Sequence, residues 1–274
     1  MTLRDLILAA IQEDMPKGDV TTESLALAPR FGKAKLVAKE DIVLSGAEPF
    51  EQTMHILEPN CKVKWNFEEG DLILKKQILC TITGDLLQIL KAERTALNFL
   101  GRLSGIATMT HLFADQVKHT QTKILDTRKT TPGFRDLEKK AVRHGGGSNH
   151  RMGLSDAILI KDNHITVSGG ISAAIERTRS HSQLPIEVET SSLEQVKEAV
   201  ICKAQRLLLD NMSNEMMAEA LKVIPDNIEV EASGNMSLDR VKSVAELGVD
   251  YISVGALTHS APCADVSLLF DWNS

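Results

Sequence analysis

The sequence predicts an α/β protein whose C-terminal part is a parallel sheet, either a barrel or a doubly wound sheet. From Lys123 onward, six short apolar runs alternate with segments of helical periodicity. This alternation is typical of consecutive βαβ units. Each apolar run ends in charged, polar or glycine residues. Because the carboxyl ends of barrel strands open onto one face, which carries the active site, we expect these residues to meet there.

The first 115 residues or so show a mixed pattern of short elements rather than this regular alternation. Apolar spacing predicts helices, and turn pairs such as Gly70-Asp71 and Gly84-Asp85 separate strand-like runs. We expect, in order, a helix over 3–11, a strand over 34–45, a helix over 49–58, strands over 62–67 and 71–83, and a long helix from residue 86 to about 120. The long helix is a candidate link between two domains.

The alternating part predicts six parallel strands. They are expected over residues 123–126, 157–161, 186–189, 206–210, 228–232 and 251–254. Helices are expected between them, for instance over 192–204 and 237–247, each opening with a serine suited to N-capping.

Composition places the chain among ordinary cytoplasmic globular proteins. It has 274 residues, of which 43% are hydrophobic and 25% charged. No apolar run is long enough to cross a bilayer, and the N-terminus lacks the pattern of a signal peptide. The four cysteines are far apart with no C-x-x-C pair. We therefore expect buried, reduced thiols rather than disulfides or a zinc site.

The net charge of −6 argues against general nucleic-acid binding but conceals an asymmetry. Residues 91–161 contain thirteen Lys/Arg and six Asp/Glu, a local charge of +7, whereas the remaining eighteen and thirty-one give −13. A basic segment of this kind is often only a solvated face. It would also suit a small polyanionic ligand, which a cleft of one sign concentrates.

The six strand ends carry complementary groups. Cations follow the first two strands, carboxylates the next two, and small residues the last two: Arg128 with Lys129, then Lys161, Glu189, Asp210, Ser233 to Asn235, and Gly255 with Ala256. Taken singly, each residue is more simply a solvated loop residue or a helix cap. Glycines between a strand and a helix also let backbone N–H groups approach a phosphate closely.

The long helix contains a second pattern. Arg94, Asn98, Arg102 and Gly105 fall in one narrow sector at helical spacing. The sector is either the solvent-exposed face of an amphipathic helix or a functional face. Asn98 and the two glycines fit a solvent-exposed face less well, because they lower helix propensity without adding solubility.

These residues belong to blocks that resemble quinolinate phosphoribosyltransferases of the decarboxylating type. The blocks occur in the family's order and span residues 13 to 258: residues 13–14, 18–22, 93–98, 104–108, 126–133, 145–151, 160–164, 187–189, 210–212, 231–234, 248–250 and 253–258. One departure is Gly101, where the family pattern has glutamine before Arg102. We expect this glycine to loosen the packing slightly.

The resemblance implies a fold and an assembly. It implies an N-terminal α/β sandwich with its linking helix over residues 1–115, then an incomplete (β/α) barrel over 116–274 whose last residues pack back on the first domain. It also implies a homodimer with shared active sites, or a higher oligomer, in which the N-terminal region of one subunit closes the barrel mouth of the other.

The resemblance also implies a pentosyltransferase reaction. Quinolinate and phosphoribosyl pyrophosphate give nicotinate mononucleotide, pyrophosphate and CO2, in de novo NAD biosynthesis and with Mg²⁺. No organic cofactor is needed, because the ribosylated ring nitrogen can itself stabilise the carbanion left by CO2. Neither nucleic acid nor membrane is expected as a partner.

Residue by residue, the resemblance assigns the site. Quinolinate would be held by Arg94 from the partner subunit, Arg128, His150 and Arg151, and Thr127 would be a further substrate-binding residue. The catalytic set would be Lys129, Lys161, Glu189 and Asp210, with both carboxylates near the ribose and, directly or indirectly, near Mg²⁺. The phosphate sites would be lined by Ser233, Gly234, Asn235, Val254, Gly255 and Ala256. The stripe Arg94–Asn98–Arg102 would then be an interface.

Other functions stay open from the sequence. One is a related phosphoribosyltransferase, of the type associated with molybdate transport or acting on nicotinate. The three arginines favour a dicarboxylate over a monocarboxylate. Another is a barrel lyase that forms a Schiff base through Lys129 or Lys161. A third is an inactive ligand-binding relative.

Overall fold

The computed structural model describes residues 1–272 and divides into two compact units. The first contains Met1–His111, Thr131–Gly146 and the described residues from Ser260 onward; the second contains Leu112–Thr130 and Gly147–His259. Helix α4 (Leu86–Val117) runs through both units. The predicted domain boundary near residue 115 stays a prediction.

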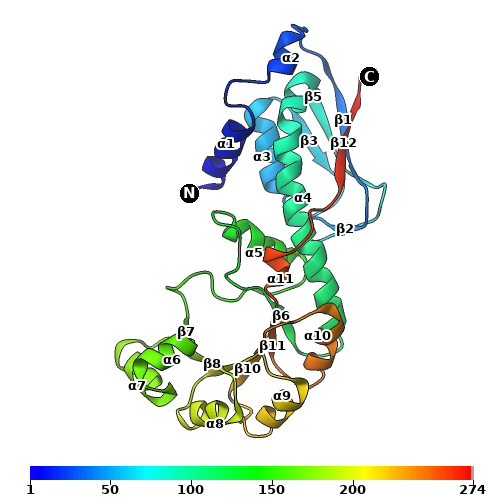
Figure 1. Ribbon diagram of the computed structural model, residues 1–274. Helices are drawn as coiled ribbons and strands as arrows, with labels where there is room; N and C mark the ends of the chain where they lie inside the picture. Colours follow the sequence, from blue (N-terminus) through cyan, green and yellow to red (C-terminus); the bar gives the residue numbers. More distant parts are fainter. Residues whose placement is uncertain (273–274) are drawn as a thin grey trace. The chain divides into compact units, whose positions relative to one another are not determined.

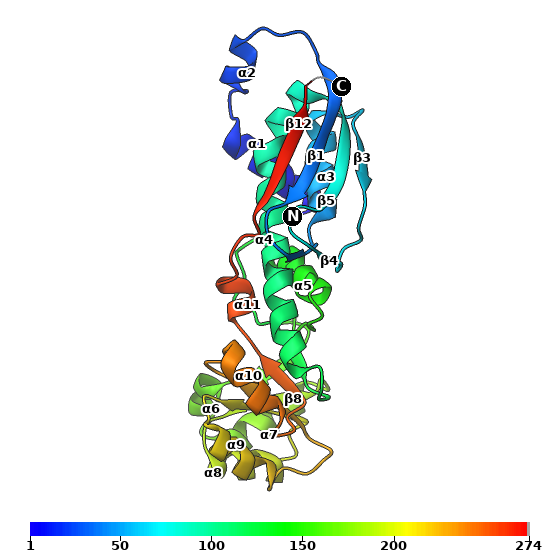
Figure 2. The same cartoon turned by 90° about the vertical axis from the view of Figure 1, so that its right-hand side faces the viewer.

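The first unit is built on a four-stranded antiparallel sheet (Figures 1 and 2). The strand order is β12 (Val266–Asp271), β1 (Phe31–Ala38), β5 (Ile78–Asp85) and β3 (Lys62–Trp65). Strand β1 pairs with β5 on one side and with β12 on the other. Strand β12, close to the C-terminus, therefore belongs to the same sheet as β1, which lies early in the chain.

Helices α3 (Ala47–Leu57) and α4 pack on this sheet through a single apolar core. Phe50 and Met54 of α3, Leu86 and Ile89 of α4, and Leu36 of β1 are all fully buried in it. Burial of apolar surface contributes about 25 cal/mol per Å², so this cluster is the main source of stability in the unit. The unit also contains α1 (Leu3–Asp14), α2 (Val20–Ser24), α5 (Arg135–His144) and a short ladder of β2 (Ile42–Val43) with β4 (Leu72–Ile73).

Two predicted strands are interrupted where the chain turns. The strand expected over 71–83 is β4 followed by β5, separated by a turn in which Lys76 has φ of 73°. The strand expected over 34–45 likewise becomes β1 and β2. The helix expected to open at Pro49 begins two residues earlier, at Ala47.

The residues of the polar sector of α4 differ in their surroundings. Arg94 and Asn98 are exposed, but the guanidinium of Arg102 pairs with the fully buried carboxylate of Glu138 at 2.8 Å and donates to the carbonyl of Ala261 at 3.2 Å. Arg102 thus makes contacts within its own unit, and the expected interface along Arg94, Asn98 and Arg102 stays a prediction.

The glycines of α4 allow the C-terminal segment to approach the helix. The amide of Ala264 donates to the carbonyl of Gly101 at 2.8 Å, and a Cβ at Gly101 would lie 3.0 Å from the Ala264 carbonyl oxygen. A Cβ at Gly105 would lie 1.8 Å from the carbonyl oxygen of Pro262. The expectation that Gly101 loosens the packing is therefore wrong, because this contact is close.

The second unit is a six-stranded parallel sheet, and the predicted fold class is confirmed (Figure 1). The strand order is β6 (Lys123–Leu125), β11 (Tyr251–Ser253), β10 (Glu229–Ser233), β9 (Arg206–Asp210), β8 (Ile186–Thr190) and β7 (Ile158–Ile160). All six correspond to predicted strands. Within residues 1–272, β6 and β7 do not pair, so the barrel is incomplete between them.

Helices connect the strands of this sheet. They are α6 (Asp162–Ser168), α7 (Ile171–His181), α8 (Leu193–Ile201), α9 (Asn214–Leu221), α10 (Leu238–Ala245) and α11 (Ala256–His259). Ser192 caps α8 by accepting from the Gln195 amide, as predicted. Ser237 occupies the N-cap of α10 but makes no such side-chain hydrogen bond.

The burial of the cysteines and the hydropathy of the helices can be compared with what composition predicted. Cys61 and Cys80 are buried, which raises the pKa of both thiols, that of Cys61 to about 11. Cys202 is partly exposed and Cys263 is exposed, so the expectation of four buried thiols is wrong for these two. None of the helices within residues 1–272 combines the length and hydropathy that crossing a bilayer requires.

Candidate active site

A cavity of about 810 Å³ lies in the second unit, at the carboxyl ends of its strands. Most of the residues predicted for the site, from strand ends or from the family resemblance, line it. They are Thr127, Arg128, Lys129, His150, Arg151, Lys161, Glu189, Asp210, Ser233, Gly234, Asn235, Gly255 and Ala256. A volume of this size suits two small substrates or one nucleotide. Their functional roles stay predictions.

The cationic side of the cavity carries two arginines and two lysines. Arg128 and Lys129 follow β6, while Arg151 lies in the loop before β7. Burial, and then the charge of nearby Arg128, lowers the pKa of Arg151. Two like charges held close together in a half-buried site are unfavourable unless an anion joins them. The pair is therefore suited to a carboxylate or phosphate.

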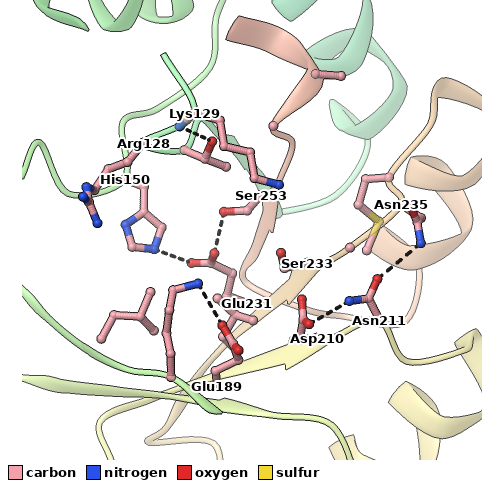
Figure 3. A pocket seen from close by; sticks show the side chains of 18 of the residues that line it. Arg128, Lys129, His150, Glu189, Asp210, Asn211, Glu231, Ser233, Asn235 and Ser253 are labelled. Carbon is pink, nitrogen blue, oxygen red and sulfur yellow. Dashed lines mark hydrogen bonds and ion pairs between the residues drawn. The ribbon is translucent and has the colours of Figure 1, made fainter. Parts of the chain in front are cut away.

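The carboxylate side lies on the neighbouring strands. Glu189 on β8 pairs with Lys161 through a distance of 3.0 Å between Oε2 and Nζ, and the Glu189 side chain is 15% exposed (Figure 3). Asp210 at the end of β9 accepts from the side-chain amide of Asn211 at 2.7 Å. Opposite charges therefore line one cavity, as their strand positions predict.

The loop after β10 has a backbone that requires glycine. Gly234 has φ of 93°, and a Cβ there would lie 2.2 Å from Oδ1 and 2.9 Å from the backbone nitrogen of Asn211. Asn235 follows with φ of 51°. Arg240 donates to the carbonyl of Gly234 at 3.2 Å and so fixes the loop from the helix that follows. The Ser233–Asn235 backbone is thus held at the cavity wall.

The loop after β11 is held against the cationic strand end. The hydroxyl of Thr258 donates to the carbonyl of Lys129 at 2.8 Å, and a Cβ at Gly255 would lie 3.2 Å from Cδ of Lys129. Val254, also predicted to line the site, is instead buried, and its amide donates to Leu125. The predicted phosphate loop therefore reaches the cavity through Gly255 and Ala256.

A buried ionic cluster forms the floor of the cavity. Nε2 of His150 lies 3.3 Å from Oε2 of Glu187 on β8 and 3.4 Å from Oε2 of Glu231 on β10. Ser253 on β11 donates to Oε1 of Glu231 at 2.5 Å (Figure 3). Behind the carboxylates, a guanidinium nitrogen of Arg206 lies 3.7 Å from Glu231.

Two influences act on the imidazole of His150. Burial lowers its pKa, but the contacts with Glu187 and Glu231 outweigh burial and raise the pKa to about 9. The amide of Arg151 opposes full protonation, because it donates to Nδ1 at 2.7 Å and a protonated Nδ1 cannot accept. Nε2 carries a proton in either form and lies at ion-pair distance from both carboxylates, without the geometry of a hydrogen bond.

The pKa values of the two carboxylates of the floor shift in opposite directions. Burial raises the pKa of Glu187 and acts in the same direction on Glu231, but contacts with His150 and Ser253 lower the pKa of Glu231. The contacts with His150 and Ser253 therefore favour the ionised form of Glu231 more than that of Glu187. Its side chain is completely buried.

Some cavity residues were missed by sequence reasoning. They include Glu231, Asn211, Ser253, Met236 and His259. The alternation of side chains along a strand was a usable signal for Glu231, since Glu231 and Ser233 share a face of β10. A carboxylate flanked by the apolar residues Val230 and Ala232 and on the same face as Ser233 predicts a polar group directed toward the cavity. The other four lie in loops or at strand ends without such a pattern.

Arg94 is the one predicted arginine that does not line the cavity. It lies on α4, in the first unit, and is exposed. Its predicted role requires a second subunit and stays a prediction.

Comparison with known proteins identifies the family to which these features belong. Residues 19–104 match the model of the quinolinate phosphoribosyl transferase N-terminal domain, and residues 106–269 match that of the C-terminal domain. The chain belongs to the quinolinate phosphoribosyltransferase family. The family prediction is confirmed.

Relatives of similar length are named for this activity. The chain is 41% identical over 263 residues to a probable nicotinate-nucleotide pyrophosphorylase [carboxylating] of Synechocystis, covering 94% of this chain and 89% of that protein. It is 38% identical to a protein of the same name from Bacillus subtilis, covering 98% and 93%. The structure of the nicotinate-nucleotide pyrophosphorylase from Francisella tularensis superposes with a TM-score of 0.94 at 36% identity, covering 98% and 96%.

Proposed function

We propose that the chain is a quinolinate phosphoribosyltransferase, a pentosyltransferase of de novo NAD biosynthesis. It transfers the phosphoribosyl group of phosphoribosyl pyrophosphate to the ring nitrogen of quinolinate and releases pyrophosphate and CO2. The observation that carries the proposal is the charge arrangement of one cavity. Four cations, Arg128, Lys129, Arg151 and Lys161, share it with the carboxylates Glu189 and Asp210, within a chain of this family.

The cations account for substrate binding. Quinolinate has two adjacent carboxylates, and the guanidinium groups of Arg128 and Arg151 can pair with them in bidentate fashion. Thr127 and His150 lie at the same end of the cavity. Lys129 and Lys161 lie between the sites for the two substrates, and the backbones of Ser233–Asn235 and Gly255–Ala256 receive phosphate groups.

The carboxylates account for the first chemical step. As the bond between ribose C1 and the pyrophosphate oxygen breaks, positive charge develops on the sugar, and Glu189 and Asp210 stabilise it. The ring nitrogen of quinolinate then forms the new bond to C1, and pyrophosphate leaves with the electron pair of the broken bond. Lys129 and Lys161 offset the negative charge of the leaving group.

The second step, the loss of CO2, depends on the pyridine ring of the substrate more than on any side chain. Ribosylation makes the ring nitrogen cationic. The bond between ring carbon 2 and its carboxylate then breaks, CO2 leaves, and the electron pair remains on carbon 2 beside the cationic nitrogen. A proton added at carbon 2 completes nicotinate mononucleotide. This chemistry requires no organic cofactor.

The donor atoms at Glu189 and Asp210 fit Mg²⁺. Both groups offer carboxylate oxygens at the cavity surface, the ligands that Mg²⁺ prefers. A bound Mg²⁺ would neutralise charge on the pyrophosphate. The cluster of His150, Glu187 and Glu231 also brings three ligand atoms within 4.8 Å of one another. Its imidazole nitrogen and its burial suit Mg²⁺ less well.

We expect activity to disappear in excess chelator and to return on addition of Mg²⁺. The melting temperature of the substrate-free protein should change little, since the ion accompanies pyrophosphate rather than supporting the fold. Steady-state turnover and thermal unfolding with and without chelator measure the two effects. Full turnover in chelator would contradict the metal assignment.

We further propose a homodimer with shared sites, in which Arg94 serves the cavity of the partner subunit. Arg94 is exposed on α4 and absent from the cavity lining of its own chain. A third guanidinium supplied in trans would complete the binding of a dicarboxylate. A higher oligomer of such dimers and a cytoplasmic location remain predictions from the sequence.

Subunit mixing tests the shared site. Arg94→Ala and Arg128→Ala chains, each inactive alone, are combined and allowed to exchange. If Arg94 acts in trans, each mixed dimer has one intact site, and activity recovers to roughly a quarter of the wild-type value, because about half the dimers are mixed. Verified exchange without recovery would show that Arg94 does not serve a partner's site.

Substrate comparison tests the proposed function against its alternatives. We expect turnover with quinolinate and phosphoribosyl pyrophosphate but not with nicotinate, because a monocarboxylate leaves arginines unpaired. Borohydride with either substrate should trap no adduct at Lys129 or Lys161. A trapped adduct would favour the Schiff-base lyase, and turnover of nicotinate alone would favour the other phosphoribosyltransferase.

A further inference from the structure

The loop that carries His150 and Arg151 bridges the gap in the incomplete barrel. Ser148 pairs with Leu125 at the edge of β6 that no strand of the sheet occupies. At the other side of the gap, the guanidinium of Arg151 donates to the carbonyl of Ala157, directly before β7, at 3.0 Å. The loop is therefore attached to both strands that border the opening.

His150 connects this loop to the barrel interior. Its backbone amide donates to Oδ1 of Asp126 at 3.0 Å, and Asp126 is fully buried. Its Nε2 faces Glu187 and Glu231 at 3.3 and 3.4 Å. Its Nδ1 accepts from the Arg151 amide at 2.7 Å. Both ring nitrogens thus face protein groups, Nδ1 through a hydrogen bond and Nε2 at ion-pair distance, although the ring lines the cavity (Figure 3).

Glu231 is held so that it can orient this ring. Its Oε1 accepts from Ser253 at 2.5 Å, and its Oε2 lies 3.7 Å from Arg206 and 3.4 Å from His150. A completely buried carboxylate with three such neighbours has little freedom to move. The orientation of the imidazole is therefore determined from the barrel interior.

We infer that His150 is a positioning residue for Arg151. Glu231 orients the imidazole ring through Nε2. Nδ1 holds the backbone of Arg151, from which the guanidinium reaches the cavity. The inference deepens the proposed function and rests on it, since Arg151 is there a substrate-binding arginine. It departs from the role expected from the family resemblance, in which His150 itself holds quinolinate.

Two substitutions of His150 separate the two roles. Asparagine places its side-chain oxygen near the position of Nδ1, where it accepts from the Arg151 amide, but it does not reach Glu231. Glutamine places its side-chain amide near the position of Nε2, where it reaches Glu231, but it offers no acceptor to Arg151. The two variants therefore each preserve one of the two ring contacts.

Under the inference, His150→Gln raises the KM for quinolinate by about tenfold and His150→Asn by less than about threefold, the cost expected for one lost hydrogen bond. The kcat and the KM for phosphoribosyl pyrophosphate should stay within about twofold in both variants. If Nε2 binds quinolinate directly, the order of the two variants reverses. A reversed order or equal effects would overturn the inference.

A double-mutant cycle tests whether His150 acts through Arg151. In an Arg151→Ala background, His150→Gln should cause no further rise in KM, because the guanidinium that it positions is absent. Additive effects would contradict the inference. Glu219→Gln is the control: Glu219 lies on α9, pairs with Lys222 at 2.6 Å and does not line the cavity. It should leave the KM unchanged.

Hydrogen exchange of the Arg151 amide in the substrate-free protein provides a readout that needs no activity. Measured in chelator, the amide should be protected in the wild type and in His150→Asn, and should exchange at least about tenfold faster in His150→Gln. Should His150→Gln fail to fold, Ser253→Ala, which removes one support of Glu231, should accelerate exchange in the same direction. Protection that chelator abolishes in the wild type would show a metal site and overturn the inference.

The two proposals can fail separately. A protected Arg151 amide in a protein that does not turn over quinolinate would refute the proposed function alone. Normal turnover of quinolinate with equal exchange in the wild type and His150→Gln would refute the positioning role alone.

Discussion

Replacing Arg128 with lysine should reduce kcat/KM for quinolinate by at least about 100-fold, the loss typical of a broken buried charge pair. Arg128 follows β6 at the cavity and lies close enough to Arg151 to lower its pKa. A lysine keeps the charge but has one ammonium in place of a planar fork, so it cannot form the bidentate pair with a carboxylate. Steady-state kinetics with quinolinate as the varied substrate measure the loss.

The control for this prediction is Arg179→Lys. Arg179 is on α7, donates to the carbonyl of Lys203 and does not line the cavity. This variant should retain activity within about twofold, as expected of a surface substitution. Both variants should unfold at the wild-type temperature. Wild-type turnover of quinolinate by Arg128→Lys would remove Arg128 from the substrate site.

Replacing Gly105 with alanine should destabilise the protein by about 3 kcal/mol or more, the upper range for overpacking. A helix-interior glycine normally gains about 1 kcal/mol on this substitution through helix propensity. Here the new Cβ would lie 1.8 Å from the carbonyl oxygen of Pro262, so the C-terminal segment must move. The clash is therefore expected to outweigh propensity.

Urea unfolding measures this balance. Gly153→Ala is the matched control, because a Cβ there meets nothing closer than 3.8 Å. It should leave the free energy of unfolding within about 0.5 kcal/mol of the wild type. A Gly105→Ala protein as stable as the wild type would contradict the close approach of the C-terminal segment to α4.

The parallel sheet was predictable from sequence because each of its strands is a local apolar run. All six strands and the long helix α4 appear where periodicity places them. Strand β12 was not predicted as a strand, although the family resemblance implied that the last residues pack back on the first domain. Its pairing with β1 joins residues separated by most of the chain, and no local pattern reports such a contact. The break at Lys76 was missed for a related reason, since a positive φ at lysine leaves no compositional signal.

The cavity wall was predictable to the extent that it consists of strand ends. Position after a strand identified Arg128, Lys161, Glu189 and Asp210, because parallel strands bring their carboxyl ends together. The floor was not predictable in the same way. Glu231 and Arg206 lie inside strands, and only the paired sheet places them against the His150 loop.

The role of Arg102 could not be read from helical spacing alone. Helical spacing placed Arg102 in the same sector as Arg94. Its partner, Glu138, lies on α5, a helix that was not predicted from the sequence. A sector of a helix is defined by periodicity, but what covers that sector is decided by tertiary packing.

The most direct test of the proposed reaction is the release of CO2 from quinolinate labelled at its 2-carboxylate. With phosphoribosyl pyrophosphate and Mg²⁺, we expect one labelled CO2 for each pyrophosphate and each nicotinate mononucleotide formed. Without phosphoribosyl pyrophosphate there should be no release, because the ring nitrogen becomes cationic only after ribosylation. Release of CO2 without phosphoribosyl pyrophosphate, or pyrophosphate formation without CO2, would contradict the account.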